Sequence, residues 1–126
     1  MHPFRAAIEA RDTEAAVAAL ADDVVFRSPI VFKPYAGKDA AAAVITAVRR
    51  IFEDFAYEAE LASEDGRDHA LVFRARMDGK EIEGCDFLHH DRDGRVDQLT
   101  VMVRPLSAAL SLRDRMAAQL ATPAAS

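Results

Sequence analysis

The chain has 126 residues, the length of one ordinary domain, so we expect a single domain over residues 1–126. Its formal charge of −5 disfavours a nucleic-acid partner, because no basic excess exists to neutralise phosphates. The single cysteine excludes an internal disulfide and fits a reducing compartment. The first residues form no long apolar run, so we expect a cytoplasmic protein without a signal peptide or a membrane partner.

The N-terminal half has the spacing of helices around one strand. Apolar residues from Phe4 to Leu20 predict two short amphipathic helices, broken near residues 11–13, where Asp12 can cap the second. Residues 24–28 are β-branched and aromatic and predict a strand, which Pro29 ends. A loop over residues 29–37 and a third helix over 38–52 follow.

Three Asp-Gly pairs divide the second half, at residues 65–66, 78–79 and 93–94. Asp-Gly is typical of tight hairpin turns, so the pattern predicts a four-stranded antiparallel meander over residues 55–63, 67–77, 80–90 and 95–104. A last helix is expected between Pro105 and Pro123, followed by a frayed tail at 124–126. Helices followed by strands indicate an α+β fold in which helices cover one face of a curved antiparallel sheet.

Four segments resemble the nuclear transport factor 2-like superfamily, and within it the SnoaL-like and ketosteroid isomerase-like proteins. They are Glu-Ala-Arg-Asp-Thr-Glu at 9–14, Leu-Ala-Asp-Asp-Val-Val-Phe-Arg-Ser-Pro at 20–29, Tyr-Ala-Gly-Lys-Asp-Ala at 35–40 and Asp-Gly-Arg-Val at 93–96. The resemblance implies a cone-shaped, curved antiparallel sheet wrapped around a long helix, with N-terminal helices. It also implies an apolar cavity inside the cone and a homodimer formed through the outer face of the sheet.

The resemblance implies three catalytic positions, of which one is retained. The isomerases use an aspartate base and an oxyanion hole made from a tyrosine and a protonated aspartic acid. Here Ser28 falls on the base and Phe4 on the tyrosine, and neither side chain can take over the role. Asp86 falls on the remaining acid and is the one catalytic candidate.

Strand alternation gives Asp86 apolar neighbours, because residues 82, 84, 86 and 88 share one face. Burial there would raise the pKa of its carboxyl and favour the protonated form. The opposite face, with Cys85, Phe87 and His89, is also largely apolar, so periodicity leaves open which face lines the cavity. A solvated or ion-paired Asp86 is the structural alternative.

The remaining candidates are expected to bind substrate around the cavity: Phe4, Phe26, Ser28, Tyr35, Phe52, Phe55, Phe73, Leu99, Val101 and Val103. Ser28 can instead bond its own turn, and Tyr35 with Lys33 can form a lid or simply pack on the rim. Gly84 predicts a bulge or a close approach by a ligand or helix.

No metal or cofactor is expected. His89 and His90 are adjacent and point to opposite faces of a strand, and His2 and His69 have no ligand-like spacing to them, so each histidine is assigned a surface or edge role. Cys85 is assigned a place as a small buried hydrophobe.

Two functions remain open. The first is a pocket protein for a small hydrophobic ligand, with isomerase-, cyclase- or hydratase-like chemistry and Asp86 as polar anchor or acid. The second is a noncatalytic homodimeric binding or assembly module whose cavity is filled by its own side chains. For either, the outer sheet face is expected to form a homodimer through an apolar strip of Val72, Cys85, Phe87, Thr100 and Met102.

Overall fold

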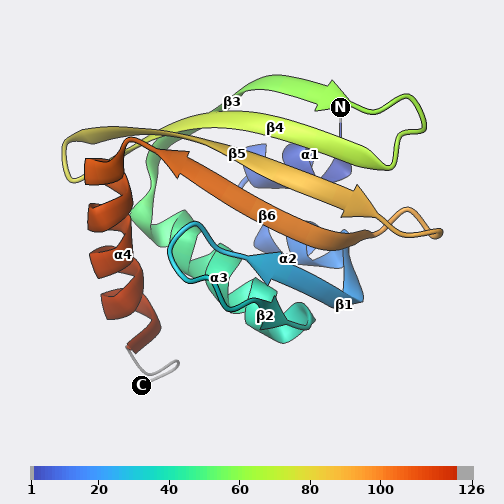
Figure 1. The fold of residues 1–126 in the computed structure, drawn as a ribbon, viewed down its shortest axis with the longest axis horizontal. Helices are drawn as coiled ribbons and strands as arrows, with labels where there is room; N and C mark the ends of the chain where they lie inside the picture. The colour runs from blue at the N-terminus through green and yellow to red at the C-terminus, as the bar shows by residue number, and fades with distance from the viewer. Residues whose placement is uncertain (1, 122–126) are drawn as a thin grey trace.

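The structure is a computed structural model that describes residues 2–121, in which a curved sheet covers a long helix (Figure 1). In chain order the elements are α1 (Pro3–Glu9), α2 (Thr13–Ala18), β1 (Leu20–Arg27), β2 (Tyr35–Ala36), α3 (Lys38–Ile51), β3 (Glu53–Ala62), β4 (Asp68–Met77), β5 (Lys80–His90), β6 (Val96–Arg104) and α4 (Leu106–Ala121). The predicted α+β fold with a curved sheet is confirmed, and the sheet is unclosed. The predicted tail at 124–126 lies outside the described residues.

The six strands lie in the order β2-β1-β6-β5-β4-β3. Strands β3 to β6 form the predicted antiparallel meander, and Leu71 of β4 pairs with Asp86 of β5, which pairs with Val101 of β6. Gly66, Gly79 and Gly94 have φ values of 73°, 76° and 80°, so the three Asp-Gly turns form where the sequence placed them. The sheet is mixed, however, because β1 pairs with β6 in parallel.

Strand β1 begins four residues earlier than predicted. Leu20 was expected in a helix, but it is fully buried and pairs with Val96, and the Val96 N–H donates to the Ala19 carbonyl at 3.0 Å. The acidic pair Asp22-Asp23 lies inside the strand, at an irregularity in the β1–β6 pairing where both side chains remain exposed. The predicted loop after Pro29 contains the two-residue strand β2, which pairs with β1.

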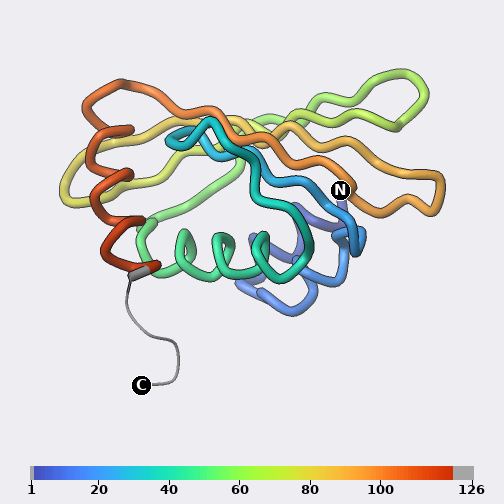
Figure 2. Tube along the Cα trace, turned by 60° about the horizontal axis from the view of Figure 1, so that its bottom comes forward, coloured from blue at the N-terminus to red at the C-terminus, as the bar shows by residue number. Residues whose placement is uncertain are grey.

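Helix α3 runs beneath the concave face of the sheet, while α1 and α2 lie at one end and α4 stands at the other (Figure 2). The buried side of α3 carries Ala41, Val44, Ile45, Ala47 and Ile51 at helical spacing, which directs one stripe toward the sheet. Asp12 caps α2 as predicted, with its carboxylate accepting the Ala15 N–H at 3.0 Å. Within residues 2–121, no helix combines the length and apolarity needed to cross a bilayer.

Candidate functional site

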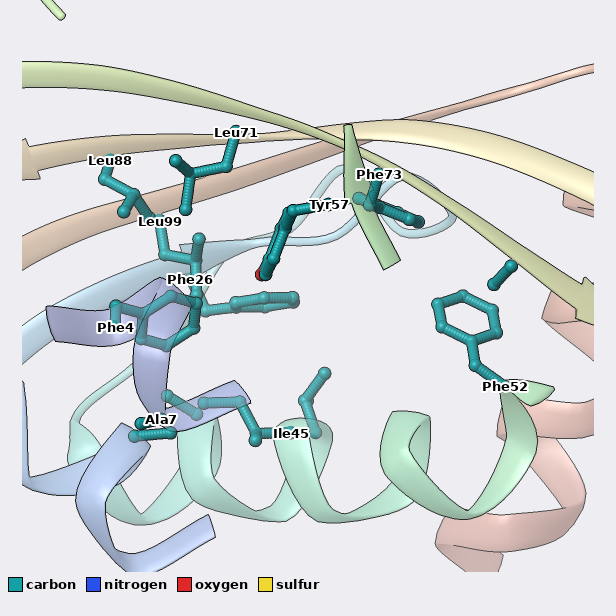
Figure 3. Close-up of a cluster of buried hydrophobic side chains, with 14 of the residues drawn as sticks. Phe4, Ala7, Phe26, Ile45, Phe52, Tyr57, Leu71, Phe73, Leu88 and Leu99 are labelled. Carbon is teal, nitrogen blue, oxygen red and sulfur yellow. The ribbon is translucent and has the colours of Figure 1, made fainter. Parts of the chain in front are cut away.

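A cavity of about 270 Å³ lies between the concave face of the sheet and helices α1, α3 and α4. Its wall is largely apolar, and Figure 3 shows Tyr57 and Phe73 pointing from the sheet toward α3, with Phe4 and Phe26 at one side. All ten residues predicted to bind substrate line this cavity: Phe4, Phe26, Ser28, Tyr35, Phe52, Phe55, Phe73, Leu99, Val101 and Val103. The structure shows that these residues line the cavity, and their role in binding a substrate stays a prediction.

Four aromatic rings form one wall of the cavity. The Phe55 ring stacks on Phe73 with centroids 5.1 Å apart and meets Tyr57 edge-to-face at 4.9 Å, and Phe52 stacks on Phe55 at 6.1 Å. Residues 55 and 57 lie two apart on β3 and point to the same face, and Phe73 faces them from β4. These contacts give the cavity an aromatic wall in which the Tyr57 ring stands at 89° to the rings of Phe55 and Phe73.

Asp86 lies on the cavity face of β5 and is 8 % exposed. The alternation of buried residues along β5 puts Ile82, Gly84 and Leu88 on the same face, as predicted. The Tyr57 hydroxyl donates to Asp86 Oδ2 at 2.7 Å, so the carboxyl is neither solvated nor paired with an arginine. The two side chains form a buried polar pair in an otherwise apolar part of the wall.

The surroundings of this pair shift the pKa values of both groups. Burial raises the pKa of the Asp86 carboxyl from 3.8 to about 7, and the hydrogen bond from Tyr57 opposes part of that rise. Burial, followed by the negative charge of Asp86, raises the pKa of the Tyr57 phenol. Near neutral pH, Asp86 therefore exchanges between an acid that donates a proton and a carboxylate that only accepts.

Ser28 lines the cavity, but its hydroxyl is occupied locally. Ser28 Oγ accepts the backbone N–H groups of Ile30 at 3.0 Å and Val31 at 2.9 Å, which closes the turn after β1. The Tyr35 ring packs near Phe26 with centroids 6.1 Å apart, and Lys33 is exposed and lies outside the cavity lining. Of the two residues considered for a lid, only Tyr35 contributes to the wall.

Tyr57 is the polar cavity side chain that sequence reasoning missed. The motif comparison looked for a tyrosine at position 4 and found phenylalanine, and the phenol is supplied instead from β3. A signal was available, because Phe55 was already a cavity candidate and strand alternation gives residue 57 the same face.

Three histidines meet outside this cavity, at the end of the sheet next to α1. His2 and His90 are 6 % and 8 % exposed and β5 is an inner strand, so the surface or edge role assigned to them is wrong, and both are in ring contact with His69. Burial lowers the pKa of His2 from 6.5 to about 4, with His90 and His69 adding to the fall. His89 points to the opposite face, as predicted, and pairs with Asp97 at 2.6 Å.

Residues 2–99 match the model of the SnoaL-like domain, which is more than half of the chain. The chain belongs to the SnoaL-like domain family. The sequence resemblance is thereby confirmed over the segment that carries the Asp86–Tyr57 pair. No curated protein matches the chain.

Solved structures share this SnoaL-like fold. A steroid delta-isomerase from Pseudomonas aeruginosa is 42% identical, with a TM-score of 0.89 over 94% of this chain and 86% of that one. An uncharacterized bacterial protein with a cystatin-like fold from Silicibacter pomeroyi is 31% identical, with a TM-score of 0.89 over 98% of this chain and 89% of that one. An NTF2-like protein of unknown function from Cytophaga hutchinsonii has a TM-score of 0.63 at 22% identity, over 84% of this chain and 88% of that one, and shows the fold alone. The fold is that of the nuclear transport factor 2-like superfamily.

Proposed function

We propose that the protein binds a small, flat, largely apolar molecule whose oxygen accepts a hydrogen bond from the Asp86–Tyr57 pair. The observation that carries the proposal is the 2.7 Å hydrogen bond between two buried polar groups in the wall of an apolar cavity. Ligand pockets are commonly apolar with a few polar groups that fix orientation. The volume of about 270 Å³ lies at the small end of such pockets and favours a compact ligand.

The number of hydroxyl protons decides in which protonation state the pair can donate a hydrogen bond to a ligand. A neutral Asp86 and Tyr57 hold two hydroxyl protons between them, and their mutual hydrogen bond uses one. The second proton is free for a ligand oxygen. An ionised Asp86 leaves only the phenol proton, which the carboxylate already accepts. The pair is therefore a hydrogen-bond donor toward a carbonyl when Asp86 is neutral.

A neutral carboxyl beside a bound carbonyl also supports chemistry. Donation to a carbonyl oxygen stabilises negative charge that develops there, which assists isomerase-, cyclase- or hydratase-like reactions on carbonyl compounds. In this proposal Asp86 is the acid and Tyr57 holds it in place. The open volume of the cavity disfavours the alternative, in which a noncatalytic module fills its cavity with its own side chains.

The test compares two ligands of the same shape by calorimetry at pH 6. One is a compact polycyclic ketone, and the other carries a methylene group in place of the carbonyl. We expect the ketone to bind about fivefold to tenfold more tightly, the worth of about one hydrogen bond. Asp97→Asn is the matched control, because this carboxylate pairs with His89 outside the cavity lining, and it should keep the preference. Equal binding of both ligands, or binding of neither, contradicts the proposal.

A separate prediction concerns ketosteroid isomerisation. The 42% identical Pseudomonas protein bears the name of that activity. In this chain, the family resemblance puts Ser28 at the position of the base, and Ser28 Oγ accepts two backbone N–H groups. The only other carboxylate along the cavity lining in the described chain is Asp12, which caps α2. We expect no isomerisation of a β,γ-unsaturated ketosteroid by ultraviolet absorbance, and turnover that Ser28→Ala abolishes would overturn this expectation.

A further inference from the structure

We propose that His2, His69 and His90 form a binding site for a divalent transition-metal ion of the zinc type, separate from the cavity. Each ring offers one nitrogen, and the three nitrogens all lie within 4.8 Å of one another. Imidazole nitrogen is a preferred ligand of zinc and of neighbouring transition metals. None of the three residues lines the cavity of the proposed function.

The fold brings together residues that are distant in sequence. Residues 69 and 90 lie on β4 and β5, on the face of the sheet that also carries Leu71 and Leu88. His2 precedes α1 and is its N-cap, which places the ring against the same end of the sheet. The Nε2 atoms of His2 and His90 are 2.6 Å apart, and ring centroids in the cluster are separated by 4.7 to 5.0 Å.

Two of the rings each keep one nitrogen as a lone pair. His90 Nδ1 lies 3.0 Å from the Arg67 carbonyl and His69 Nε2 lies 3.1 Å from the Gly66 carbonyl. A carbonyl oxygen only accepts, so each of these nitrogens carries the ring proton and leaves the other nitrogen as a lone pair. Backbone carbonyls that hold the outer N–H of a histidine are the usual second shell of a metal ligand.

The free nitrogen of His69 also points to a ligand at this cluster. His69 Nδ1 is buried and has no hydrogen-bond partner within the described chain. Buried polar atoms are nearly always paired, so an orphan of this kind needs an explanation. A cation held between the rings supplies one.

His2 is the ligand that must adjust. Its Nδ1 accepts the Phe4 N–H at 3.0 Å, so Nε2 carries the proton and points it at His90 Nε2. When the ion binds, this proton moves to Nδ1, the Phe4 N–H loses its acceptor and Nε2 becomes a ligand. The two Nε2 atoms then separate to about 3.3 Å, as ligands about 2.0–2.1 Å from a tetrahedral zinc require. His2 is therefore the weakest of the three ligands.

The surroundings leave room for a fourth ligand. The cluster borders a polar recess lined by Glu60, Asp65, Arg67, Asp91 and Arg92, among others. Glu60 pairs with Arg5 at 3.3 Å, so the remaining carboxylates of the recess, Asp65 and Asp91, are matched in number by the guanidinium groups of Arg67 and Arg92. With three protein ligands, one tetrahedral position remains for water from this recess.

The test titrates ZnCl₂ into the chelator-treated full chain, without a histidine tag, by calorimetry, and repeats the titration with CoCl₂ to record visible absorption. We expect one ion per chain and the absorption bands of tetrahedral cobalt. His69→Ala and His90→Ala should weaken binding by about tenfold or more, and His2→Ala by less. His89→Ala is the matched control, since this neighbouring histidine faces away and pairs with Asp97.

Two further measurements keep the result interpretable. Thermal unfolding of each variant without metal shows whether it folds, and a folded His69→Gln replaces any alanine variant that does not. Asp86→Asn should bind zinc as the wild type does, because the cavity is separate. No saturable one-to-one binding, or an equal loss in His89→Ala and His69→Ala, overturns the site.

Discussion

The proposed function depends on single atoms of the Asp86–Tyr57 pair. A carboxyl that is buried among apolar groups is stable as the neutral acid, and its pKa of about 7 places the change of state at neutral pH. Tyr57 supplies the one hydrogen-bond partner that the structure gives to this carboxyl. Removing either group leaves the other buried without its partner, which costs about 1–3 kcal/mol.

Stability should depend on pH through Asp86. Its pKa rises from 3.8 to about 7 on folding, so its contribution is fully present below pH 4 and is lost as pH rises to about 7. Asp86→Asn keeps an acceptor for Tyr57 and removes the titration. We expect denaturant unfolding to give Asp86→Asn an advantage of about 1 kcal/mol or more at pH 8 that shrinks at pH 5. A difference between the two proteins that does not change with pH contradicts the assigned burial.

At this scale the sequence predicted the position of Asp86 but not its partner. The motif resemblance selected residue 86, and strand alternation predicted its apolar neighbours. The hydroxyl that completes the pair comes from β3, 29 positions away in the chain, and a motif centred on position 4 could not locate it. Local patterns give the face of a side chain, whereas its contacts depend on strand pairing.

At the scale of elements, the contact between Phe73 and Gly84 packs β4 closely against β5. The two residues are paired across the strands, and the Phe73 ring occupies the space above the glycine. The predicted bulge is absent, because the β4–β5 register is continuous through residue 84. The close approach that Gly84 permits comes from an aromatic ring of the neighbouring strand, not from a ligand or a helix.

Gly84→Ala should therefore destabilise the fold. A methyl group at this position would lie 2.3 Å from the Phe73 ring and 2.7 Å from the Met102 carbonyl, and the backbone atom cannot move aside cheaply. We expect a loss of about 1–3 kcal/mol in the free energy of unfolding, measured by denaturant titration. Ala75→Gly, on the same face of β4, is a packing control that removes a methyl group instead of adding one. An unchanged midpoint for Gly84→Ala would show that the ring is not held there.

Element boundaries show where sequence patterns fail. The meander was predicted closely because three Asp-Gly turns mark its ends. Strand β1 was predicted too short because Asp22 and Asp23 oppose strand formation locally, while parallel pairing with β6 extends the strand through them. That parallel pairing joins the two halves of the chain, and no local sequence pattern predicts it.

At the scale of the whole molecule, the outer face of the sheet is partly apolar. Phe87 and Met102 are 42% and 58% exposed, and both belong to the strip that the sequence predicted. Arg74, Arg76 and Arg104 are exposed around it. We propose that two copies of the chain associate through this face.

Light scattering at micromolar concentration should give the mass of a dimer. Phe87→Glu places a charge in the strip and should produce a monomer, whereas Phe32→Glu, at a fully exposed apolar residue of the loop between β1 and β2, should leave the dimer intact. A monomeric wild type contradicts the proposed interface.

The histidine cluster is likewise formed by contacts between residues that are distant in sequence. Each of the three rings is isolated in sequence, and the closest contact joins residues 88 positions apart. Spacing rules for metal ligands apply within a turn or a hairpin, so they could not group residues brought together by a helix cap and two strands.

The central claim is that neutral Asp86, held by Tyr57, donates a hydrogen bond to a ligand carbonyl inside the cavity. The most direct measurement is the infrared carbonyl stretching frequency of a bound, isotope-labelled polycyclic ketone at pH 5.5 and pH 8.5. Donation weakens the C=O bond, so we predict a lower frequency at pH 5.5, where Asp86 is neutral, than at pH 8.5, with no such change in Asp86→Asn. A bound ketone with the same frequency at both pH values in the wild type would contradict the claim.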